Sequence, residues 1–419
     1  MPMTAAASSV RDRIAGELDT LVALRHDLHR IPEVMHEERL TSARIQRELT
    51  ELGIPFVTGL GGHEPGTGTG IVAHLPASRD GAPVETHRLA VAIRADMDAL
   101  PIEEQTGAPY ASTHPGVMHA CGHDGHMTTA LGAARVLASL PDRPNPVTLV
   151  FQPAEEGGFG GEYMVRDGCL DGAERLGEGM GPKVARMYGM HGWPELPLGV
   201  VSTRPGPLMA STDEFTMTVV GRGGHGAYPH LCKDPILASA GVIQAVQQIV
   251  ARVVKPLSPA VITVASIHAG KANNVIPGEV EMNGTRRAID AGTRELLQRE
   301  FLRVVDDAAR AYGCEARVNW EPGYPVVRND ADEAERALRI AREVVGVERA
   351  RVEPEPTMGG EDFAYYCDKV PACFFWVGLG ERDRAGSEKE PLLHESRFDF
   401  KDKALPTSVE MMVRLALDE

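Results

Sequence analysis

The hydrophobic positions near the start of the chain recur at the spacing of a helix. They are Val10, Ile14, Leu18, Leu21 and Leu28. Residues three or four positions apart lie on one face of an α-helix, so this spacing predicts an amphipathic helix over residues 8–30. Pro32 has no backbone N–H to continue the helical hydrogen bonds, and we expect the helix to stop before it.

Further along, short apolar runs lead repeatedly into polar residues. The runs cover residues 89–93, 147–151, 184–190 and 372–377. Runs of this length predict buried strands, and helical patterns lie between them. Strands that alternate with helices predict an α/β domain with a mainly parallel sheet flanked by helices. The polar residues that follow each run would then gather at the carboxyl ends of the strands, where such sheets carry their sites.

The pattern changes at about residue 211. From there it predicts a strand at 215–220, a helix at 236–253, strands at 261–267 and 280–287, a helix at 296–311 and a strand at 316–320. The order βαββαβ is that of a small two-layer, ferredoxin-like sandwich. We therefore predict that an inserted domain, residues 211–325, interrupts a catalytic domain made of residues 1–210 and 326–419.

Composition narrows the class of protein. The chain has 419 residues, 43% of them hydrophobic and 24% charged, which is typical of a folded protein with two domains. Its formal net charge of −16 argues against nucleic acid as a partner. No apolar run approaches the roughly 18 residues of a membrane span, and the first residues lack the order of a secretory signal. We expect a cytoplasmic protein without a membrane partner. The six cysteines form no C-x-x-C pair, which suits a reducing compartment.

The candidate chemistry is densest between His119 and His126, where the chain reads His-Ala-Cys-Gly-His-Asp-Gly-His. Imidazole, thiolate and carboxylate groups are the ligands that zinc and related divalent metals prefer. Two other interpretations are open for Cys121: a buried structural cysteine among solvent-facing histidines, or a nucleophile paired with a histidine. The nucleophile alternative leaves the acids and histidines elsewhere in the chain without a role.

Further candidates follow the other apolar runs. Glu155 and Glu156 come after the second run, and a metal-assisted hydrolase needs one carboxylate that binds metal and one that stays free to move a proton. A solvated acidic turn is the ordinary alternative. His191 and His394 complete plausible ligand sets for two ions, although each alone could be a core histidine. Asp96 and Asp98 could accept hydrogen bonds from ligating histidines and so orient them, or could belong to a turn.

These motifs together resemble one family from end to end. The chain resembles the metallo-amidohydrolase branch of the aminoacylase/carboxypeptidase superfamily, which includes hippurate hydrolases, N-acyl-amino-acid amidohydrolases and plant indole-acetyl-amino-acid hydrolases. The matching motifs lie at residues 27–33, 94–101, 118–124, 151–156, 190–192, 223–229, 273–277, 284–287, 359–363 and 393–394. The resemblance implies a catalytic domain of the zinc-exopeptidase type with a lid or dimerisation domain inserted into it.

The resemblance also assigns roles to residues of this chain. The implied metal ligands are Cys121, His123, Glu156, His191 and His394, with Cys121 as the bridge between two divalent ions. Zinc or manganese is the implied metal, with cobalt or nickel as alternatives. Glu155 is the implied general base. His225 and Asn274 of the inserted domain, Arg287, Gly359 and Gly360 would contact the substrate, although Arg286 beside Arg287 leaves that arginine open to reassignment.

The predicted function follows from these roles. We expect hydrolysis of the amide bond of N-acyl-L-amino acids by metal-activated water, in a homodimer or a larger oligomer built from dimers. A carboxypeptidase or dipeptidase that uses the same two-metal site is the alternative within enzymes. A binding protein on an inactive hydrolase fold is the alternative outside them, and retention of the base and all five ligands argues against it.

Overall fold

Two units make up the chain in the computed structural model, which describes residues 5–381 and 390–419. Unit 1 comprises Met1–Gly206, Arg328–Pro354 and Asp362–Glu419, and unit 2 comprises Pro207–Val327 and Glu355–Glu361. The boundaries differ from the expected 211–325 mainly in the second segment. Residues 355–361 were expected in the catalytic domain, but Thr357 N–H donates to Leu208 O and Ala210 N–H donates to Gly359 O, which ties this segment to unit 2.

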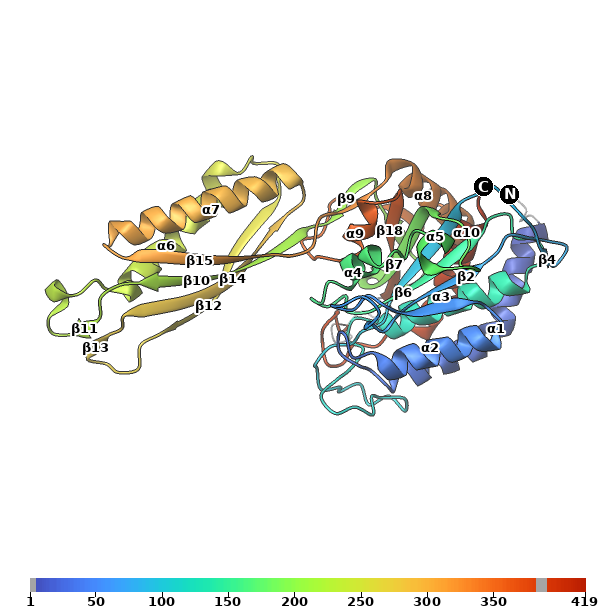
Figure 1. Ribbon diagram of the computed structural model, residues 1–419, viewed down its shortest axis with the longest axis horizontal. Helices are drawn as coiled ribbons and strands as arrows, with labels where there is room; N and C mark the ends of the chain where they lie inside the picture. Colours follow the sequence, from blue (N-terminus) through green and yellow to red (C-terminus); the bar gives the residue numbers. More distant parts are fainter. Residues whose placement is uncertain (1–4, 382–389) are drawn as a thin grey trace. The chain divides into compact units, whose positions relative to one another are not determined.

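Unit 1 is built on an eight-stranded sheet with the order β1-β2-β6-β5-β7-β18-β8-β17 (Figure 1). Its strands are β1 (Phe56–Leu60), β2 (Gly70–Leu75), β5 (Ala90–Asp96), β6 (Val147–Gln152), β7 (Val184–Pro197), β8 (Val201–Thr203), β17 (Ala350–Val352) and β18 (Ala372–Gly380). The central strands β6, β5, β7 and β18 run parallel, whereas β1, β2 and the β18–β8 contact are antiparallel. The predicted mainly parallel α/β sheet is confirmed.

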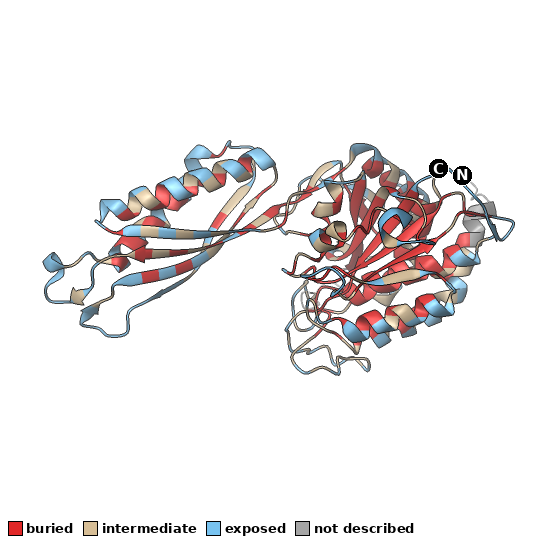
Figure 2. Cartoon of the chain, in the orientation of Figure 1, coloured by how far each residue is buried: buried red, intermediate tan, exposed pale blue. Residues whose placement is uncertain are grey.

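Burial explains why the central strands read as unbroken apolar runs. Every residue of β5, β6 and β18 is buried, as Figure 2 shows for the sheet of unit 1. A parallel strand covered on both faces needs no alternation of polar and apolar residues. The strands extend past their apolar runs: β5 continues to Asp96, β18 to Gly380 and β7 to Pro197. Asp96 and His191 therefore lie within strands instead of after them.

Helices flank this sheet. They are α1 (Ala5–His29), α2 (Arg39–Glu51), α3 (His123–Ser139), α4 (Gly160–Arg166), α5 (Ala173–Leu176), α8 (Ala331–Val345), α9 (Ala364–Cys367) and α10 (Leu405–Leu417), with a 3-10 turn at Asp402–Ala404 and a short β3–β4 hairpin (Ser78–Arg79, Ala82–Pro83). The helices α1, α3 and α10 pack on one another, and α10 also packs on α8. The predicted first helix is α1. Of the five apolar positions that predicted it, Val10, Ile14, Leu21 and Leu28 are buried in this layer and Leu18 is partly buried.

Unit 2 has the predicted βαββαβ order. Its elements are β10 (Ser211–Val220), α6 (Pro235–Gln248), β12 (Ala260–Ala269), β14 (Glu279–Ala288), α7 (Ala291–Ala311) and β15 (Glu315–Pro322). The sheet order β12-β14-β10-β15 is antiparallel throughout. Buried and less buried positions alternate along β10, as expected for a sheet with helices on one face only (Figure 2).

The ends of unit 2 add shorter elements that periodicity did not predict. They are a β11–β13 ribbon (Gly224–His225, Val275–Ile276), a 3-10 turn at Pro229–Leu231 and a π-helical turn at Ile249–Val253. The strands β9 (Gly206–Met209) and β16 (Val327–Asn329) cross two of the points at which the chain passes between the units. The expected helix over 236–253 is therefore an α-helix to Gln248 and a wider turn beyond it. Its start is fixed by Asp234, whose side chain accepts hydrogen bonds from Ile236 N–H and Leu237 N–H.

Candidate metal centre

A glycine turn sets the direction of the two ligands nearest in sequence, Cys121 and His123. Gly122 has φ 84°, in the left-handed region, and immediately precedes α3. A side chain at Gly122 would also lie 3.2 Å from Phe400, and one at Gly125 would clash with the same ring at 2.4 Å. The glycines therefore let the chain reverse tightly into the helix, with Cys121 and His123 buried on either side of the turn.

The first ligand group joins this turn to β7. The candidate ligand atoms of Cys121, His123 and His191 all lie within 4.8 Å of one another, and all three residues are buried. The Cys121 Sγ atom is 3.3 Å from His191 Nε2. Strand β7 runs parallel to β5, so His191 reaches the same edge of the sheet as the residues that follow β5.

The second ligand group shares Cys121 with the first. It contains Cys121, Glu156 and His394, whose candidate ligand atoms again lie within 4.8 Å of one another. The Nε2 atom of His394 is 3.2 Å from Glu156 Oε1. His394 adopts a left-handed backbone with φ 64°, and its N–H donates to Ala120 O, which fixes it beside the Cys121 turn. The structure thus gathers all five predicted ligands in two groups with one common thiol.

The hydrogen bonds of His123 fit a metal ligand. Its Nδ1 is 2.8 Å from the backbone oxygen of Asp98, which holds that nitrogen as the donor. Its Nε2 is buried and makes no hydrogen bond to the described residues, although Asp96 Oδ2 lies 3.7 Å from it. A buried imidazole nitrogen without a partner is costly unless something else occupies its lone pair. A divalent cation would satisfy it, and the thiol and carboxylate neighbours are the donors such a cation takes.

The charges at the centre also fit a cation. Burial raises the pKa of the Cys121 thiol well above its usual value, and Glu156 and Glu155 raise it further. Burial disfavours a charged imidazole at His123, but Asp96 and Asp98 overcome this effect and raise its pKa to about 10. Burial and the neighbouring His126 hold the pKa of His191 well below its usual value. The metal-free centre therefore keeps protons on the thiol and on His123, and metal binding would have to displace both.

Asp96 does not hold one of the five predicted ligands by a hydrogen bond. Its Oδ1 accepts from His126 Nδ1 at 2.7 Å, and its Oδ2 accepts from Arg94 Nη1 at 2.6 Å. Asp98 instead orients His123, through its backbone oxygen. His126 was part of the dense sequence cluster but had no predicted role, and its Nε2 accepts from the N–H of Gly192 at 3.0 Å. His126 therefore links Asp96 to the backbone of Gly192, the residue after His191, because one of its ring nitrogens bonds to each.

Glu155 lies beside the two ligand groups on a sharply bent segment. It is 6% exposed, and its candidate ligand atom lies within 4.8 Å of those of His123 and Glu156. Ala154 before it has φ 55°, a left-handed conformation that is rare for residues other than glycine. The N–H of Asp362 points at Glu155 Oε1 at 3.4 Å. The bend thus brings the carboxylates of both adjacent glutamates to the centre, beside His123.

A buried network that the sequence reasoning did not assign lies next to Glu155. Arg94 Nη2 is 3.0 Å from Asp362 Oδ1, and Arg94 Nε donates to Gln152 Oε1. Asp362 also accepts from Gln152 Nε2 and from the N–H of Gly161. The motif around residue 362 was the available signal, but nothing in the sequence alone pairs it with Arg94 across 268 residues.

In unit 2 the structure brings His225 and Asn274 together. They lie on or next to the β11–β13 ribbon, where His225 pairs with Val275 and Gly226 N–H donates to Asn274 O. Both side chains are exposed. His225 Nδ1 accepts from the N–H of Ala227 at 3.0 Å, so its Nε2 is the nitrogen left for other partners.

The two neighbouring arginines of β14 have different surroundings. Arg286 is 3% exposed, forms an ion pair with Asp213 at 2.9 Å, and lies 4.1 Å over the ring of Trp320. Arg287 points to the opposite face of the strand and is only partly buried. Arg286 is thus committed to the fold of unit 2, which leaves Arg287 as the better candidate for a substrate.

The two predicted glycines belong to the 355–361 segment of unit 2. Gly359 is exposed. A side chain at Gly360 would lie 2.1 Å from the methyl group of Thr212, so any other residue would require the Thr212 side chain to move.

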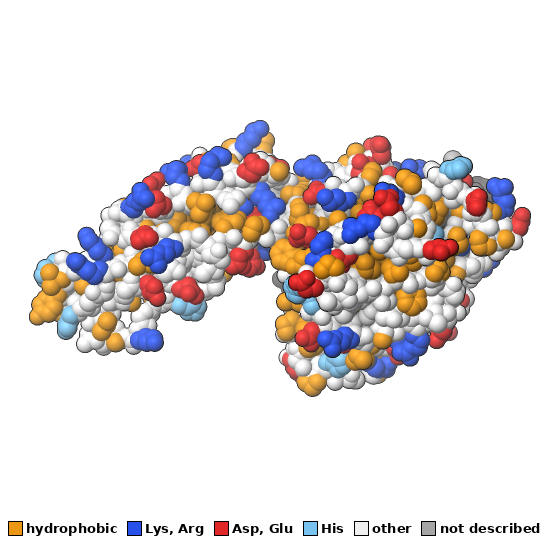
Figure 3. Space-filling model, in the orientation of Figure 1, with side chains coloured by type: hydrophobic (Ala, Val, Ile, Leu, Met, Phe, Trp, Pro, Cys, Tyr) orange, Lys and Arg blue, Asp and Glu red, His pale blue; other side chains and the backbone are white. Residues whose placement is uncertain are grey.

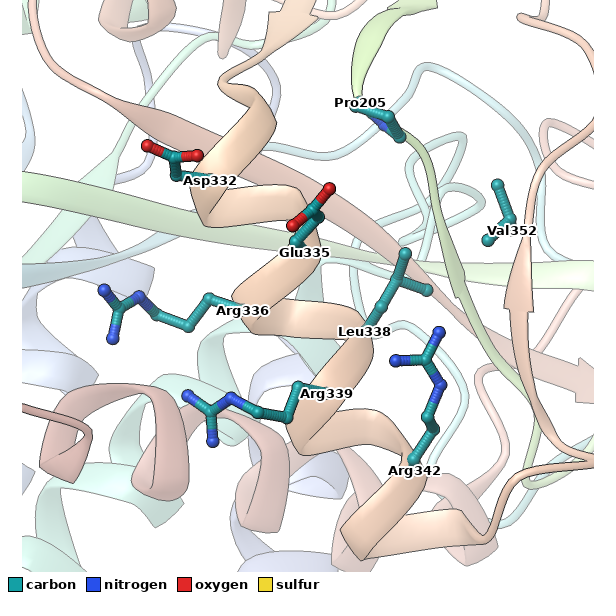
Figure 4. A pocket seen from close by; sticks show the side chains of 8 residues that line it. All are labelled: Pro205, Asp332, Glu335, Arg336, Leu338, Arg339, Arg342 and Val352. Carbon is teal, nitrogen blue, oxygen red and sulfur yellow. The ribbon is translucent and has the colours of Figure 1, made fainter.

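A cavity elsewhere in unit 1 is not part of this centre. It has a volume of about 650 Å³ and lies on the surface of α8 (Figure 4). Its lining residues are Pro205, Asp332, Glu335, Arg336, Leu338, Arg339, Arg342 and Val352. Two of the three arginines that line the cavity, Arg336 and Arg339, form ion pairs with Asp418 and are therefore not available to bind a ligand.

The fold and the ligand set together define a class. A mainly parallel α/β sheet with thiol, imidazole and carboxylate ligands at its carboxyl edge is typical of metal-dependent hydrolases. A model of the family described as Peptidase family M20/M25/M40 matches residues 92–418. The chain therefore belongs to this family, and the resemblance to its metal-dependent amidohydrolases is confirmed.

Several relatives bear on the reaction. The chain is 38% identical over 366 residues to N-acetyl-L-cysteine deacetylase of Bacillus subtilis, with 87% of this chain and 81% of that protein covered. It is 34% identical over 403 residues to IAA-amino acid hydrolase ILR1-like 4 of Arabidopsis thaliana, covering 95% and 85%. It is 35% identical over 364 residues to thermostable carboxypeptidase 1 of Saccharolobus solfataricus, covering 86% of each. A solved structure of Bacillus subtilis YXEP, described as a dinuclear metal binding peptidase, matches with a TM-score of 0.77 and 32% identity over 96% of this chain and 98% of that one.

Proposed function

We propose that the protein hydrolyses the amide bond of N-acyl-L-amino acids and releases a carboxylic acid and an amino acid. The observation that carries the proposal is the pair of ligand groups that share Cys121, with Glu155 beside both. The relatives named as a deacetylase and as an amino acid hydrolase support this choice of substrate.

Two divalent ions are the proposed cofactors. Cys121, His123 and His191 would hold one ion, and Cys121, Glu156 and His394 the other. Bound there, the ions would supply Lewis acidity to the amide carbonyl and to water. Zinc suits the thiol and imidazole donors, and manganese, cobalt or nickel is the alternative.

Glu155 is the proposed general base and acid. Its carboxylate accepts a proton from the attacking water and later gives that proton to the nitrogen of the leaving amine. Water attacks the acyl carbon directly, the C–N bond breaks, and no covalent acyl-enzyme forms. The N–H of Asp362, 3.4 Å from Glu155 Oε1, would help to keep the carboxylate in place.

Unit 2 supplies the proposed contacts to the rest of the substrate. His225 Nε2 and the Asn274 amide are donors that could hold the developing oxyanion, a role worth on the order of 3 kcal/mol per donor. Arg287 would bind the free α-carboxylate of the substrate. The backbone groups of Gly359 and Gly360 would line the same site. These roles require unit 2 to act as a lid on the site of its own chain, or to supply the contacts to the site of the partner chain in a dimer.

A homodimer is the proposed assembly, and the surface of α6 supports it. Ile236 and Leu237 on this helix are 45% and 57% exposed. Figure 3 shows further exposed hydrophobic side chains at the end of unit 2 that carries β11 and β13, where Tyr228 and Leu231 are exposed. The segment Pro235–Val253 is long and apolar enough to cross a membrane by length and composition alone, and 28% of it is buried. A second copy of the chain would cover this surface, and we propose the cytoplasm as its compartment because all six cysteines are free.

A metallo-carboxypeptidase or dipeptidase with the same centre is the alternative, and the relative named as a carboxypeptidase favours it. Amidohydrolase and peptidase activity can be distinguished with pairs of substrates that differ only in whether they carry a free amine. The assay compares N-acetyl, N-benzoyl and long-chain acyl amino acids with matched dipeptides, with zinc, manganese, cobalt or nickel supplied. We expect each acyl amino acid to be hydrolysed faster than its matched dipeptide. Faster cleavage of every dipeptide would overturn the proposal in favour of a peptidase.

A further inference from the structure

Two residues of one segment, His36 and Glu38, form hydrogen bonds to the bend that carries Glu155 and Glu156. Glu38 Oε1 accepts a hydrogen bond from the N–H of Ala154 at 2.9 Å, directly before Glu155. His36 Nε2 lies 2.9 Å from Gly158 O, two residues after Glu156. His36 and Glu38 are far in sequence from the bend, and together they form what we call the brace.

The carboxylate of Glu38 is fully used by this arrangement. It is completely buried and accepts from three donors: Ala154 N–H, His36 N–H at 2.9 Å and Thr69 Oγ1–H at 2.6 Å. A buried carboxylate is tolerated only when its oxygens are paired in this way. The same side chain therefore fixes its own segment, a loop at Thr69 and the start of the bend.

The bend needs such support because its backbone is unfavourable. Ala154 has φ 55° and Gly157 has φ 92°, and His36 itself is left-handed at φ 65°. Residues other than glycine stay in this region only where surrounding contacts hold them there. At Gly158 even a methyl group would lie 2.6 Å from Ala154 Cβ and 3.0 Å from His36 Nε2, so the brace packs tightly on the bend.

A second carboxylate holds the other side of Glu155. Asp98 Oδ2 accepts from the N–H of Glu156 at 2.9 Å, and Asp98 also holds His123 through its backbone oxygen. The amides on either side of Glu155 are thus each bound by a buried carboxylate. This fixes the backbone of Glu155 and Glu156, whose carboxylates both lie beside His123.

We propose that Glu38, with His36, is a positioning device that holds the bend so that Glu155 faces the substrate while Glu156 faces the metal. This rests on the proposed function for the two roles. Glu38 acts through its acceptor oxygens, because Oε1 receives the N–H groups of Ala154 and His36 and Oε2 receives the Thr69 hydroxyl. A glutamine can supply one oxygen to Ala154 and His36 and turn its amide toward the Thr69 hydroxyl, which accepts as well as donates.

The test compares Glu38→Ala, Glu38→Gln and His36→Ala with a matched control, Glu33→Ala. Glu33 also accepts three hydrogen bonds, from Leu40 N–H, Thr41 N–H and the Thr41 hydroxyl, but none comes from the bend. Three measurements are made on each full-length protein: hydrogen exchange of the peptide over residues 154–158 without metal, zinc affinity by chelator competition, and kcat and KM on the best acyl amino acid.

The proposal expects Glu38→Ala and His36→Ala to speed exchange of the bend by about tenfold or more. Glu38→Ala removes the acceptor of the Ala154 N–H, and His36→Ala removes the contact that holds the carbonyl of Gly158. Glu38→Ala should lower kcat on the order of a hundredfold with KM little changed, because small displacements of a catalytic group have effects of this size. Zinc affinity should fall with it, and Glu38→Gln should restore most of the loss.

Two results would overturn the proposal. One is unchanged exchange of the bend in both His36→Ala and Glu38→Ala relative to Glu33→Ala. The other is a Glu38→Gln protein that is folded and as impaired as Glu38→Ala. His36→Ala keeps the test decisive if Glu38→Ala fails to fold, because His36 is only partly buried. If the wild type cleaves no acyl amino acid, the proposed function fails, while exchange and zinc affinity still decide the role of the brace.

Discussion

Cys121 Sγ and His191 Nε2 lie 3.3 Å apart although 70 residues separate them in the chain. Replacement of Cys121 by serine keeps the size of the side chain but exchanges a soft ligand for a poorly ionised hydroxyl. We expect Cys121→Ser to lose metal from both groups, since Cys121 belongs to both, and to lose activity by at least about a hundredfold. Metal analysis by mass spectrometry and a hydrolysis assay on the same preparations measure the two losses.

Cys169→Ser is the matched control for this change. Cys169 is also fully buried and free, but it belongs to neither ligand group. We expect it to keep about two metal ions per chain and its activity, which a strong chelator should then remove. A fully active, metal-loaded Cys121→Ser protein would exclude the ligand role. Loss of activity on alkylation of metal-loaded wild type would favour the nucleophile alternative.

The two adjacent glutamates should respond differently to the same substitution. Glu155→Gln removes only the group that moves the proton, so we expect near-normal metal content and a kcat lower on the order of 10²–10⁴-fold. Glu156→Gln removes a ligand of the second group, so we expect weaker metal binding, measured by chelator competition. If Glu155→Gln lost metal while Glu156→Gln kept it, the two roles would have to be exchanged.

Local patterns predicted the elements because they report on burial along a single segment. The helix from Val10 to Leu28 and the buried run of β6 were visible in this way, and so was the βαββαβ order of unit 2. Contacts between residues that are far apart in the chain could not be predicted in this way. Nothing in the sequence distinguishes the role of Asp96 from that of Asp98, because the difference lies in which histidine nitrogen each one meets in space.

Backbone conformation was the other feature hidden from the sequence. Left-handed turns are usually signalled by glycine, as at Gly122. Ala154 and His394 adopt the same region without that signal; Ala154 directly precedes Glu155, and His394 is itself a predicted ligand. Contacts from distant segments hold them there, so their conformations follow only from the folded structure. This is also why Glu38, the partner of Ala154, was not singled out from the sequence.

The two arginines of β14 allow a matched test of substrate binding. Arg287→Ala should raise KM about tenfold to a hundredfold for acyl amino acids with a free α-carboxylate, because a charge-assisted hydrogen bond is lost. The amides of the same substrates should be little affected. Arg286→Ala should instead lower the thermal stability of unit 2, since it breaks the buried pair with Asp213. A selective KM effect in Arg286→Ala, absent in Arg287→Ala, would reverse the assignment.

His29 should make the stability of unit 1 depend on pH in the alkaline range. This fully buried residue lies 2.9 Å from Asp124 Oδ2 through Nδ1 and 3.3 Å from Glu104 Oε1 through Nε2. Burial alone would lower its pKa, but Asp124 and Glu104 reverse the effect and raise the pKa to about 9. A histidine pKa that is higher in the folded state stabilises the fold below the unfolded pKa of 6.5, and this stabilisation is lost as the pH rises through 9.

We therefore expect the free energy of unfolding of wild type to fall relative to that of His29→Gln by about 2–3 kcal/mol between pH 7 and pH 10. Denaturant titrations at several pH values, with tryptophan fluorescence as the readout, measure the difference. His74→Gln is the control: burial, then Arg143, lowers the pKa of His74 to about 4, so it is neutral throughout this range and its difference from wild type should stay flat. A flat difference for His29→Gln as well would mean that His29 is neutral in the folded protein, and that Arg25 alone balances Asp124 at the start of α3.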